Sequence, residues 1–407
     1  MHVVMFADQH LESLGGAQVS MRLQKRFLER AGHVVTVVAP RLHRPAPDDT
    51  AYLDLPSIPL TLDREYALTW PGARTDRFVD SEMGARLPVD VVHVQADFWG
   101  AYIGHRFAAR HGLPVVHTMH NRVDVGIEAT APFPGLVLRA LNAWARRALP
   151  RQVTAPVAGR DVAPAGSDID GWAYLRRLAA VSRAVTAPSG HFARRLERHG
   201  VADAVDVIWN GIDDDALDAA LAAGPTERRP GRPRFVWLGR MSPEKRLLPF
   251  LEAVAESGID AEVEIIGGGG QLRAAQRLIE RRAPVASVTF AGRLSYAETL
   301  RRLADADAVV QTSIGFETQG MTVFEAASLG TPAVVSDPDI GAELGAGIWT
   351  VPDATVAALS QTLRRSAADI AAGSPVTPDA SVAERFRQSS RTAAMVAVYE
   401  RAVAAGR

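Results

Sequence analysis

Short apolar runs rich in β-branched residues alternate with helical patterns along the whole chain, and this alternation restricts the possible folds more than any other feature. Val3–Ala7 has the length of one buried strand, and the segment Ala17–Arg30 after it has the periodicity of a helix. Repeated strand–helix units of this kind form parallel sheets with helices on both faces. The sequence therefore predicts the α/β fold class.

The predicted strands form two series, which are separated by loop-like sequence. The first series consists of Val3–Ala7, Val34–Val38, Val91–Val94, Val115–His117, Val185–Ala187 and Val205–Ile208. The second series consists of Arg234–Leu238, Glu262–Ile266, Val288–Ala291, Ala308–Gln311 and Ala333–Ser336. Between them lie Asn210–Asp213 and the Pro-, Gly- and Arg-rich stretch Gly224–Pro233. We therefore predict two Rossmann-like domains that face a central cleft, with the ligand at the carboxyl ends of the strands.

Length and composition agree with this organisation and exclude several classes of protein. A chain of 407 residues is too long for one ordinary core. No apolar run approaches the roughly 20 residues that cross a bilayer, and Met1–Ala7 lacks the features of a signal peptide. Zero cysteines exclude disulfides and thiolate metal sites and fit a cytoplasmic protein. A net charge of −1 argues against general nucleic-acid binding.

Two carboxylates, Glu317 and Glu325, lie eight residues apart in a segment that predicts a strand, a Gly-containing loop and a short helix. The strand is Ala308–Gln311, and the helix ends before Gly330–Pro332. An acid just before a helix can hydrogen-bond the hydroxyls of a sugar. An acid one turn into the helix can reach the hydroxyls of a ribose.

The start of that helix completes the motif. The backbone N–H groups of Gly320, Met321 and Thr322 are predicted to lie free there. A helix N-terminus carries about half a positive charge and binds phosphate groups, so the whole segment suits a nucleotide-sugar. The alternative is an ordinary capping box, because Thr322-x-x-Glu325 has the required spacing. A capping box leaves Glu317 and Gly320 unexplained.

Two basic residues follow an earlier strand of the second series. Arg240 and Lys245 come after the end of Arg234–Leu238, and such a pair can neutralise a diphosphate as its bond to the sugar breaks. The chain contains only two lysines, Lys25 and Lys245, among 45 basic residues. A lysine in such an arginine-rich chain favours a role for a compact charge on phosphate. The alternative is two solvated cations on a surface loop.

Two glycine loops are further candidates for ligand contact. Gly267–Gly270 follows a strand of the second series and lets a ligand approach the backbone closely. Gly15 and Gly16 precede the helix Ala17–Arg30, which makes a second glycine loop at a helix N-terminus. This loop does not match the GxGxxG fingerprint, so a dinucleotide site is not supported.

Two other strand ends carry candidate residues. His120 follows the strand Val115–His117 and can hydrogen-bond a donor sugar or an acceptor. Arg293 and Leu294 follow a strand of the second series, where the arginine is available near a nucleobase. Each of these residues taken alone is more often structural, and His93, inside an apolar strand, is predicted to be structural.

The sequence contains no HExxH or DxD motif and no clustered set of metal ligands. We therefore expect no metal site and no cofactor. The charge on a leaving diphosphate would instead be neutralised by Arg240, Lys245 and the helix N-termini.

These features follow one another in a definite order: Gly15-Gly16, His120, Gly239-Arg240 with Lys245, and Glu317 with Glu325. In this order they resemble the retaining GT-B glycosyltransferases. The chain is most similar to bacterial diacylglycerol glucosyltransferases, with phosphatidylinositol mannosyltransferases as more distant relatives. The resemblance covers nearly the whole chain. Its most specific segments are Val91–Gln95, Pro114–His120 and Glu317–Gly320.

The resemblance implies a role for each candidate residue. Glu317 would contact hydroxyls of the donor sugar, and Glu325 the ribose. Arg240 and Lys245 would hold the diphosphate, with Gly16 lying against it. The other donor-binding candidates are Gly15, Gly267, Gly268, Arg293, Leu294, Gly320, Met321 and Thr322, of which Arg293 and Leu294 would lie near the base.

The resemblance also implies chemistry and architecture. The chain would be a retaining hexosyltransferase of glycolipid biosynthesis that uses UDP- or GDP-hexose without a metal ion. His120 would touch the transferred sugar, and the leaving phosphate would take the acceptor proton during front-side attack. The implied domains are residues 1–208 for the acceptor, 209–381 for the nucleotide-sugar, and 382–407, whose helix Val382–Ala404 returns to the first domain.

The acceptor is where this sequence departs from the family. Asn121–Asp124 replaces a tyrosine-rich continuation, and Pro150–Trp172 is unusually rich in Pro, Gly and Ala. Leu136–Leu149 predicts an amphipathic helix whose apolar stripe includes Trp144. The arginines beside this stripe are Arg139, Arg146 and Arg147. The stripe either packs in the core or lies on an anionic membrane at the inner face of the plasma membrane. A lipid acceptor and a soluble or polysaccharide acceptor are both retained.

Other function classes fit the same fold. A sugar-nucleotide epimerase would convert its donor without an acceptor. A phosphorylase would need a lysine for pyridoxal phosphate, and the loop position of Lys245 suits that role poorly. A non-catalytic binding module would bind without turnover, although both acids and both cations are present. A glycosyltransferase is the leading prediction.

Overall fold

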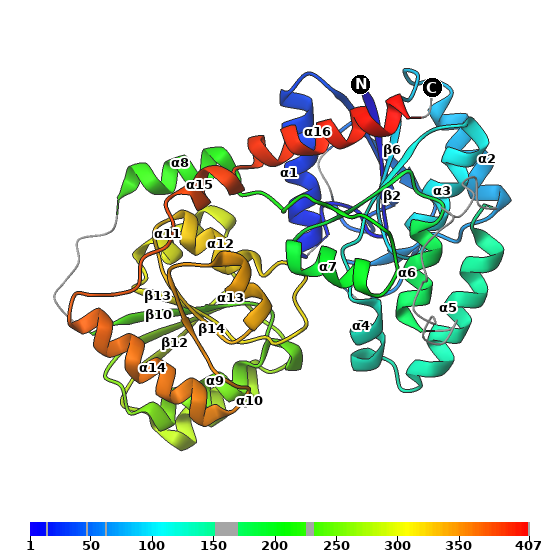
Figure 1. Cartoon of the computed structure of the whole chain (residues 1–407). Coiled ribbons are helices and arrows are strands. Elements are labelled where there is room, and N and C mark those ends of the chain that lie inside the picture. Colours follow the sequence, from blue (N-terminus) through cyan, green and yellow to red (C-terminus); the bar gives the residue numbers. More distant parts are fainter. Residues whose placement is uncertain (14, 46–47, 62, 151–169, 225–231, 406–407) are drawn as a thin grey trace. The chain divides into compact units, whose positions relative to one another are not determined.

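The computed structural model describes residues 1–13, 15–45, 48–61, 63–150, 170–224 and 232–405 (Figure 1). Within this part, the chain forms two compact units. Unit 1 consists of Met1–Gly211 and Arg391–Arg407, and unit 2 consists of Ile212–Ser390. The chain therefore passes between the units after Gly211 and after Ser390, whereas the limits expected from the sequence are 208 and 381.

Unit 1 contains a seven-stranded parallel sheet with the strand order β3-β2-β1-β6-β7-β8-β9. Its strands are β1 (His2–Ala7), β2 (Val34–Pro40), β3 (Tyr52–Leu55), β6 (Val91–Gln95), β7 (Val115–Thr118), β8 (Ala184–Ala187) and β9 (Asp206–Val207). A separate antiparallel pair consists of β4 (Ile58–Pro59) and β5 (Ala67–Leu68). The strand order reverses between β1 and β6, and ligands of such sheets bind at the carboxyl ends of the strands beside this reversal.

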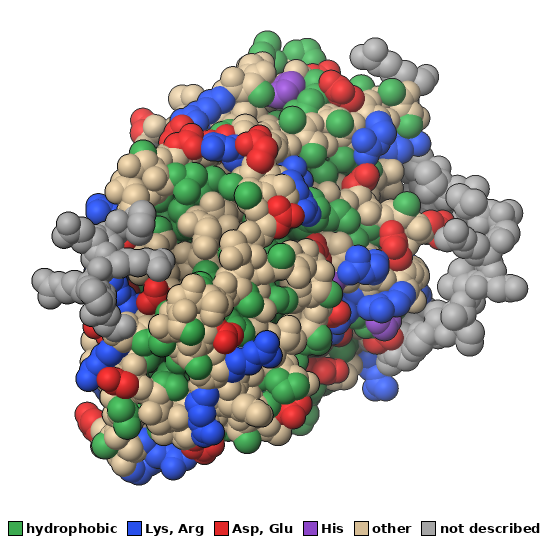
Figure 2. All heavy atoms as spheres, turned by 60° about the vertical axis from the view of Figure 1, so that its left-hand side comes forward, with side chains coloured by type: hydrophobic (Ala, Val, Ile, Leu, Met, Phe, Trp, Pro, Cys, Tyr) green, Lys and Arg blue, Asp and Glu red, His purple; other side chains and the backbone are tan. Residues whose placement is uncertain are grey.

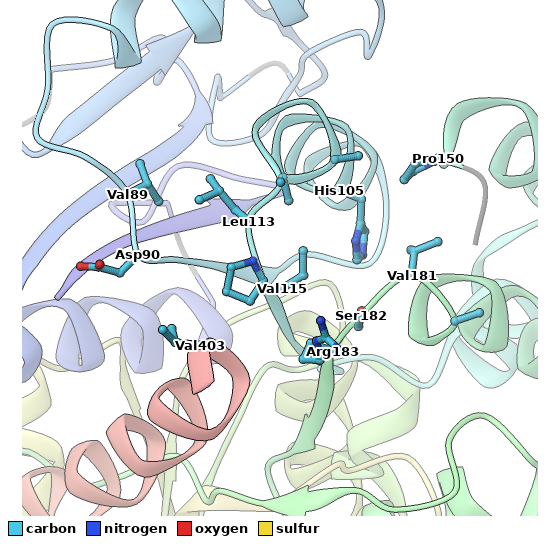
Figure 3. A pocket seen from close by; sticks show the side chains of 15 residues that line it. Val89, Asp90, His105, Leu113, Val115, Pro150, Val181, Ser182, Arg183 and Val403 are labelled. Carbon is cyan, nitrogen blue, oxygen red and sulfur yellow. The ribbon is translucent and has the colours of Figure 1, made fainter. Parts of the chain in front are cut away.

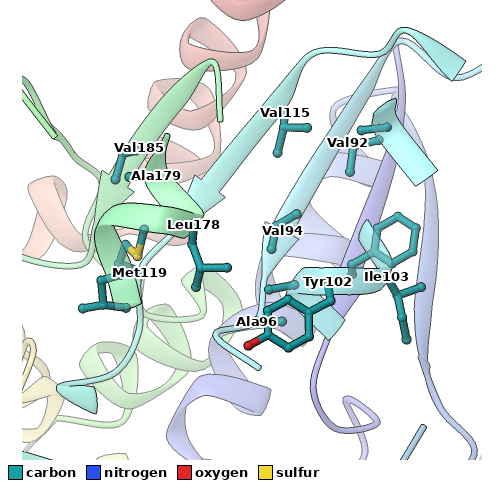
Figure 4. Close-up of a cluster of buried hydrophobic side chains, with 14 of the residues drawn as sticks. Val92, Val94, Ala96, Tyr102, Ile103, Val115, Met119, Leu178, Ala179 and Val185 are labelled. Atoms are coloured by element: carbon teal, nitrogen blue, oxygen red, sulfur yellow. The ribbon is translucent and has the colours of Figure 1, made fainter. Parts of the chain in front are cut away.

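The helices of unit 1 connect these parallel strands. They are α1 (Gly16–Arg30), α2 (Ala73–Met83), α3 (Trp99–His111), α4 (Val123–Thr130), α5 (Pro134–Ala148), α6 (Gly171–Ala179) and α7 (Gly190–Arg198). Helix α16 (Gln388–Ala404) joins them from the end of the chain. Side chains of β6, β7, β8, α3 and α6 fill one part of the core, with Tyr102, Met119 and Leu178 fully buried (Figure 4).

Unit 2 repeats the same plan with a six-stranded parallel sheet in the order β12-β11-β10-β13-β14-β15. Its strands are β10 (Arg234–Leu238), β11 (Glu262–Ile266), β12 (Ser287–Gly292), β13 (Ala308–Gln311), β14 (Ala333–Val335) and β15 (Ile348–Thr350). Its helices are α8 (Asp214–Ala223), η1 (Pro243–Lys245), α9 (Leu247–Ser257), α10 (Leu272–Arg282), α11 (Tyr296–Asp305), α12 (Met321–Ser328), α13 (Pro338–Leu344), α14 (Val356–Ala371) and α15 (Ser381–Phe386). The reversal of strand order lies between β10 and β13.

The predicted α/β class and the two Rossmann-like series are confirmed, and β10, β11 and β13 have the predicted bounds. Strands β3 and β15 were not predicted from the sequence. Both are outer strands of their sheets and are only four and three residues long, so neither produces a conspicuous apolar run.

The last predicted helix, Val382–Ala404, is in fact two helices that are separated at Arg387. There the backbone of Ile212 forms hydrogen bonds with the residues on both sides of Arg387. Its N–H donates to the Phe386 carbonyl at 2.7 Å, and its carbonyl accepts from Gln388 N–H at 2.8 Å. With these bonds Arg387 has φ −54° and ψ 137°, outside the helical region, and the helix is interrupted there. Periodicity alone could not reveal this break, because its cause lies far away in the sequence.

Helix α16 packs into the core of unit 1, in agreement with the expected return of the last helix to the first domain (Figure 1). Met395, Val398 and Tyr399 are nearly fully buried in one cluster with residues of β1 and β2. The C-terminal segment is therefore a structural part of unit 1.

Helix α5 covers most of the predicted segment Leu136–Leu149. Leu138 and Ala145 are buried, and Leu141, Trp144 and Ala148 pack against the core of unit 1. Trp144 also stacks with Trp70 at 5.1 Å between ring centroids. The core interpretation of the apolar stripe is correct for these residues. Trp144 is only partly buried, so its contact with membrane headgroups stays a prediction.

The surface carries acidic and basic side chains mixed together on the face shown in Figure 2, in keeping with the net charge of −1. None of the helices in the described ranges is long and apolar enough to cross a membrane.

Candidate functional site

The candidate residues of unit 2 lie at the carboxyl ends of its parallel strands, and backbone hydrogen bonds join the loops that carry them. Gly239 N–H donates to the Ile266 carbonyl at 3.1 Å, and Met241 N–H donates to the Gly268 carbonyl at 2.9 Å. Gly267 N–H donates to the Gly292 carbonyl at 2.7 Å. The loops after β10, β11 and β12 therefore form one connected surface.

Two glycines of this surface differ in how closely other residues approach them. Gly267 has a φ of 124°, and a Cβ atom there would lie 2.0 Å from the carbonyl oxygen of Gly239. The close approach of two loops explains this residue. At Gly268 a Cβ atom would lie 3.5 Å from Nε of Arg293, so the predicted base-binding arginine borders the glycine loop.

Lys245 and Glu317 form an ion pair between the loops that follow β10 and β13. Glu317 Oε1 accepts hydrogen bonds from Lys245 Nζ and, at 2.7 Å, from Ser313 Oγ. Thr312 Oγ1 donates to the Lys245 carbonyl at 2.6 Å, which fixes the backbone of the lysine. The side chains of Lys245 and Glu317 are 24% and 16% exposed, so a ligand can reach both.

Arg240 is paired separately. Its guanidinium lies 2.9 Å from Glu244 Oε1, and its side chain is 65% exposed. The structure therefore gives Arg240 and Lys245 each their own carboxylate partner. A surface arginine in high dielectric interacts weakly with one carboxylate, so Arg240 can turn toward a phosphate at little cost.

Helix α12 begins at Met321, with Gly320 as its N-cap residue and no side-chain cap. Thr322 is thus inside the first turn, and the capping-box interpretation of Thr322 and Glu325 is wrong. Gly320 has a φ of 78°, and a Cβ atom there would lie 2.7 Å from Ile340 Cδ1. The left-handed conformation and the contact with Ile340 together require glycine.

Glu325 is 5% exposed on the buried side of α12, next to Tyr296 at the start of α11. Burial raises the pKa of the Glu325 carboxyl to about 7, because a charged carboxylate is costly away from water. Sequence reasoning did not identify Tyr296, and the only sequence signal for it is its position just after Arg293 and Leu294.

In unit 1, Gly15 and Gly16 stand at the start of α1, which also lacks a side-chain cap. A Cβ atom at Gly15 would collide with Gln18, 2.2 Å from its Oε1, whereas a Cβ atom at Gly16 would have nothing within 4 Å. Gly16 therefore faces open space, as a residue that contacts a ligand must.

His120 lies just beyond the end of β7 and is 9% exposed. Its Nε2 lies 3.1 Å from Gln95 Oε1 at the end of β6. Burial lowers the pKa of His120 to about 4, so the ring is neutral near pH 7. His93 is fully buried and hydrogen-bonded to Tyr399 at 2.7 Å, which agrees with the prediction of a structural role.

Sequence reasoning missed two acids that follow β1 and β6, the partly buried Asp8 and the buried Asp97. Asp8 accepts hydrogen bonds from the backbone N–H groups of Asp97 and Gly100, both at 2.8 Å, and burial raises its pKa to about 7. Asp97 is fully buried and accepts from Asn121 Nδ2 at 2.7 Å. Asp8 follows β1 directly, and Asp97 comes shortly after β6. Both could have been identified from the sequence by considering every polar residue that comes shortly after a predicted buried strand.

A hollow of about 470 Å³ also lies in unit 1 (Figure 3). Its lining includes Asp90, Val115 and Arg183, which stand just before or at the start of β6, β7 and β8. Because the candidate site residues follow the strands, the hollow lies at the opposite edge of the sheet. None of the predicted site residues lines it.

Among the described residues, no group of three or more histidine, aspartate and glutamate side chains could hold a metal ion. The Pro-, Gly- and Ala-rich stretch Pro150–Trp172 includes residues 151–169, which lie outside the described residues.

Each of the two units contains a segment that matches a known family of glycosyltransferases. The family of glycosyl transferases group 1 matches residues 223–365, and Glycosyltransferase Family 4 matches residues 14–158. The alpha-monoglucosyldiacylglycerol synthase of Streptococcus pneumoniae is 23% identical over 351 residues, which is 82% of this chain and 70% of that protein. A GDP-mannose-dependent alpha-mannosyltransferase of Mycolicibacterium smegmatis is 28% identical over 341 residues, which is 83% of this chain and 80% of that protein.

Solved structures agree on the fold. Sucrose-phosphate synthase from Thermosynechococcus elongatus matches with a TM-score of 0.67 and 18% identity over 99% of each chain. Anabaena HepE in complex with UDP matches with a TM-score of 0.66 and 15% identity over 98% of this chain and 100% of that chain. Since both halves of the chain match, and in the order that the sequence motifs predict, the chain belongs to the GT-B glycosyltransferases of group 1.

Proposed function

We propose that this protein is a retaining hexosyltransferase that transfers a hexose from UDP- or GDP-hexose to a lipid acceptor of the diacylglycerol type. The observation that carries the proposal is the Lys245–Glu317 pair, on loops that follow two neighbouring strands of unit 2, with the uncapped start of α12 just beyond Glu317. A cation, an acid and a helix N-terminus are the groups that a nucleotide-sugar needs.

The contacts suggest how the donor binds. A diphosphate at the start of α12 would draw Lys245 away from Glu317, because two phosphate charges attract the ammonium group more than one carboxylate does. Glu317 would then be free to accept hydrogen bonds from the sugar. Glu325 would bind the ribose, and Arg293, beside Gly268, would lie near the base.

Relatives support the choice of donor and acceptor. One similar structure is a complex with UDP-glucose, and one similar enzyme depends on GDP-mannose. The names of other relatives include alpha-monoglucosyldiacylglycerol synthase and phosphatidyl-myo-inositol mannosyltransferase. These names favour a UDP- or GDP-linked hexose and a lipid with a free hydroxyl.

The surface of α5 also favours a lipid acceptor. Phe133 and Leu136, at the start of this helix, are 70% and 66% exposed. Farther along the helix, Arg139, Arg146 and Arg147 are exposed. Exposed apolar residues next to basic ones are typical of a surface that rests on an anionic membrane. We therefore propose a peripheral location at the cytoplasmic face of the membrane that holds the acceptor.

Cations and helix ends are proposed to replace a metal ion in the reaction. Arg240, Lys245 and the N-terminus of α12 would neutralise the leaving diphosphate, and its phosphate would take the proton of the attacking hydroxyl. We expect turnover to survive EDTA. We also expect Lys245→Ala and Arg240→Ala each to weaken binding of UDP or GDP more than binding of the matching nucleoside.

The deciding experiment incubates the protein with UDP-glucose, UDP-galactose or GDP-mannose and vesicles that contain diacylglycerol. We expect one donor to yield a glycolipid with the anomeric configuration of the donor, as read by NMR. Product with the opposite configuration would disprove retention. Conversion of the donor without acceptor would instead identify an epimerase, and sugar release that requires inorganic phosphate would identify a phosphorylase.

A further inference from the structure

A chain of hydrogen bonds between buried side chains runs through unit 1 and ends at His120. In its middle, the hydroxyl of Tyr399 of α16 lies 2.7 Å from His93 Nδ1. His93 Nε2 lies 2.7 Å from Thr118 Oγ1, which in turn lies 2.6 Å from Thr186 Oγ1. All of these side chains are less than 5% exposed, so water cannot replace their partners.

Two glutamines connect these hydrogen-bonded side chains to His120. Gln24 of α1 donates from Nε2 to the Tyr399 hydroxyl at 3.4 Å, so that hydroxyl is left to donate to His93. Gln95 donates from Nε2 to Gln24 Oε1 at 2.6 Å. This donation leaves Gln95 Oε1 facing His120 Nε2 at 3.1 Å.

The direction of the last bond decides the state of the His120 ring. A carboxamide oxygen can only accept a hydrogen bond, so His120 Nε2 must carry the proton. A neutral imidazole has one N–H group, and Nδ1 is therefore left with a free lone pair. Within the described part of the chain, His120 Nδ1 makes no hydrogen bond, and it is not among the buried polar atoms that lack a partner. It is therefore accessible to solvent and is the ring nitrogen that a ligand can reach.

We propose that Gln95 is a positioning residue that fixes the tautomer of His120, so that Nδ1 accepts a hydrogen bond from a hydroxyl of the transferred sugar. The identity of the sugar partner rests on the proposed function, whereas the tautomer does not. Burial supports the assignment independently, because it lowers the pKa of His120 to about 4 and keeps the ring neutral during catalysis.

The same network explains why a glutamine occupies this position in the strand. Gln95 must donate to Gln24 and accept from His120 at once, and a carboxamide is the side chain that does both without a charge. A glutamate would still accept from His120 but could not donate to Gln24. A methionine has a similar shape, but it can neither donate a hydrogen bond to Gln24 nor accept a strong one from His120.

The first test reads the tautomer directly. ¹⁵N NMR of protein labelled in histidine, with the His120 signals assigned through His120→Gln, distinguishes the protonated from the bare ring nitrogen. We expect protonated Nε2 in the wild type and in Gln95→Glu, and a shift toward protonated Nδ1 in Gln95→Met. Thr186→Val, at the far end of the network, is the control that should leave His120 unchanged. Protonated Nδ1 in the wild type would overturn the proposal.

The second test links the tautomer to turnover. We expect Gln95→Met to lower kcat roughly five- to tenfold, the size of one neutral hydrogen bond, and to leave the Kd of UDP or GDP unchanged. Gln95→Glu should recover kcat only at a pH high enough to keep the ring neutral, because its carboxylate raises the pKa of His120 and favours a proton on Nδ1 as well. Thr186→Val should keep the kcat of the wild type. If Gln95→Met changes the tautomer but not kcat, Nδ1 does not contact the sugar and that part of the proposal is wrong. Because the NMR test needs no substrate, failure of the proposed transferase activity would be recognised separately.

Discussion

Both lysines of the chain form ion pairs with carboxylates. Lys25 contacts Glu29 at 2.9 Å and Asp49 at 2.8 Å and is 9% exposed, whereas Lys245 pairs with Glu317 and is more exposed. The rarity of lysine therefore did not single out a phosphate ligand, because one of the two has a structural pairing. What distinguishes Lys245 is its place at a strand end beside an uncapped helix.

Replacement of Glu317 tests the sugar contact at the residue scale. Glu317→Gln keeps the shape of the side chain and removes the charge that pairs with Lys245. We expect kcat to fall on the order of 10²–10³-fold, as for the loss of one group that stabilises developing charge, with little change in the melting temperature. Glu256→Gln, an exposed acid on α9, is the matched control. Full activity of folded Glu317→Gln protein would exclude the role.

Glu325 predicts a pH dependence of stability. Its pKa is about 7 in the folded protein against an ordinary value of 4.5. The folded state therefore holds this proton more tightly, and that stabilisation is complete below pH 4.5 and is lost as the pH rises through 7. We expect Glu325→Gln to gain up to about 3 kcal/mol in the free energy of unfolding over wild type between pH 5 and pH 8.

The measurement for Glu325 is urea unfolding of wild type and Glu325→Gln at several pH values. Asp8, whose pKa burial also raises to about 7, is present in both proteins and cancels in the difference. A difference that stays constant from pH 5 to pH 8 would contradict the raised pKa of Glu325.

Among the individual elements, helix α5 packs one side against the core of unit 1 and exposes the other to solvent. Its buried side carries Leu138 and Ala145, and its outer side carries Arg139, Arg146 and Arg147. The apolar stripe that the sequence predicts is thus used by the core. The residues that we propose for membrane contact are those at the exposed start of the helix and the three arginines.

Charge reversal on α5 tests that contact. We expect the wild type to bind vesicles with anionic lipid at low salt, and Arg139→Glu with Arg146→Glu and Arg147→Glu to lose binding, since each nearby arginine contributes about 1 kcal/mol. Vesicle flotation measures the effect, and donor hydrolysis should be spared. The matched control reverses Arg273, Arg277 and Arg281, which are exposed on α10 of unit 2. Equal loss of binding in the control would point to net charge alone.

At the scale of the whole molecule, the chain crosses between the units twice, so its last segment stabilises the unit that begins the chain. Met395 of α16 is 2% exposed in the core of unit 1. We expect Met395→Ala to cost about 2–5 kcal/mol and to speed hydrogen exchange in β1 and β2. Leu251→Ala in the core of unit 2 should act on β10 and β11 instead. Faster exchange confined to unit 2 in Met395→Ala would be incompatible with this packing.

The sequence alone was sufficient to predict most strands and helices, because their periods depend on residues only a few positions apart. It predicted the parallel α/β series, the strand ends that carry Arg240, Lys245, Glu317 and His120, and the glycine loops beside them. Short outer strands such as β3 escaped this reasoning, because a few half-buried residues produce no clear pattern.

Which side chains meet, and which lose contact with water, becomes visible only once the chain is folded. Lys245 and Glu317 are 72 residues apart, and Tyr399 and His93 are 306 residues apart. No local pattern encodes such pairs, since they depend on how the strands are ordered in the sheets. The same is true of the raised pKa of Glu325 and the partial burial of Trp144, because both depend on the neighbours that folding places around them.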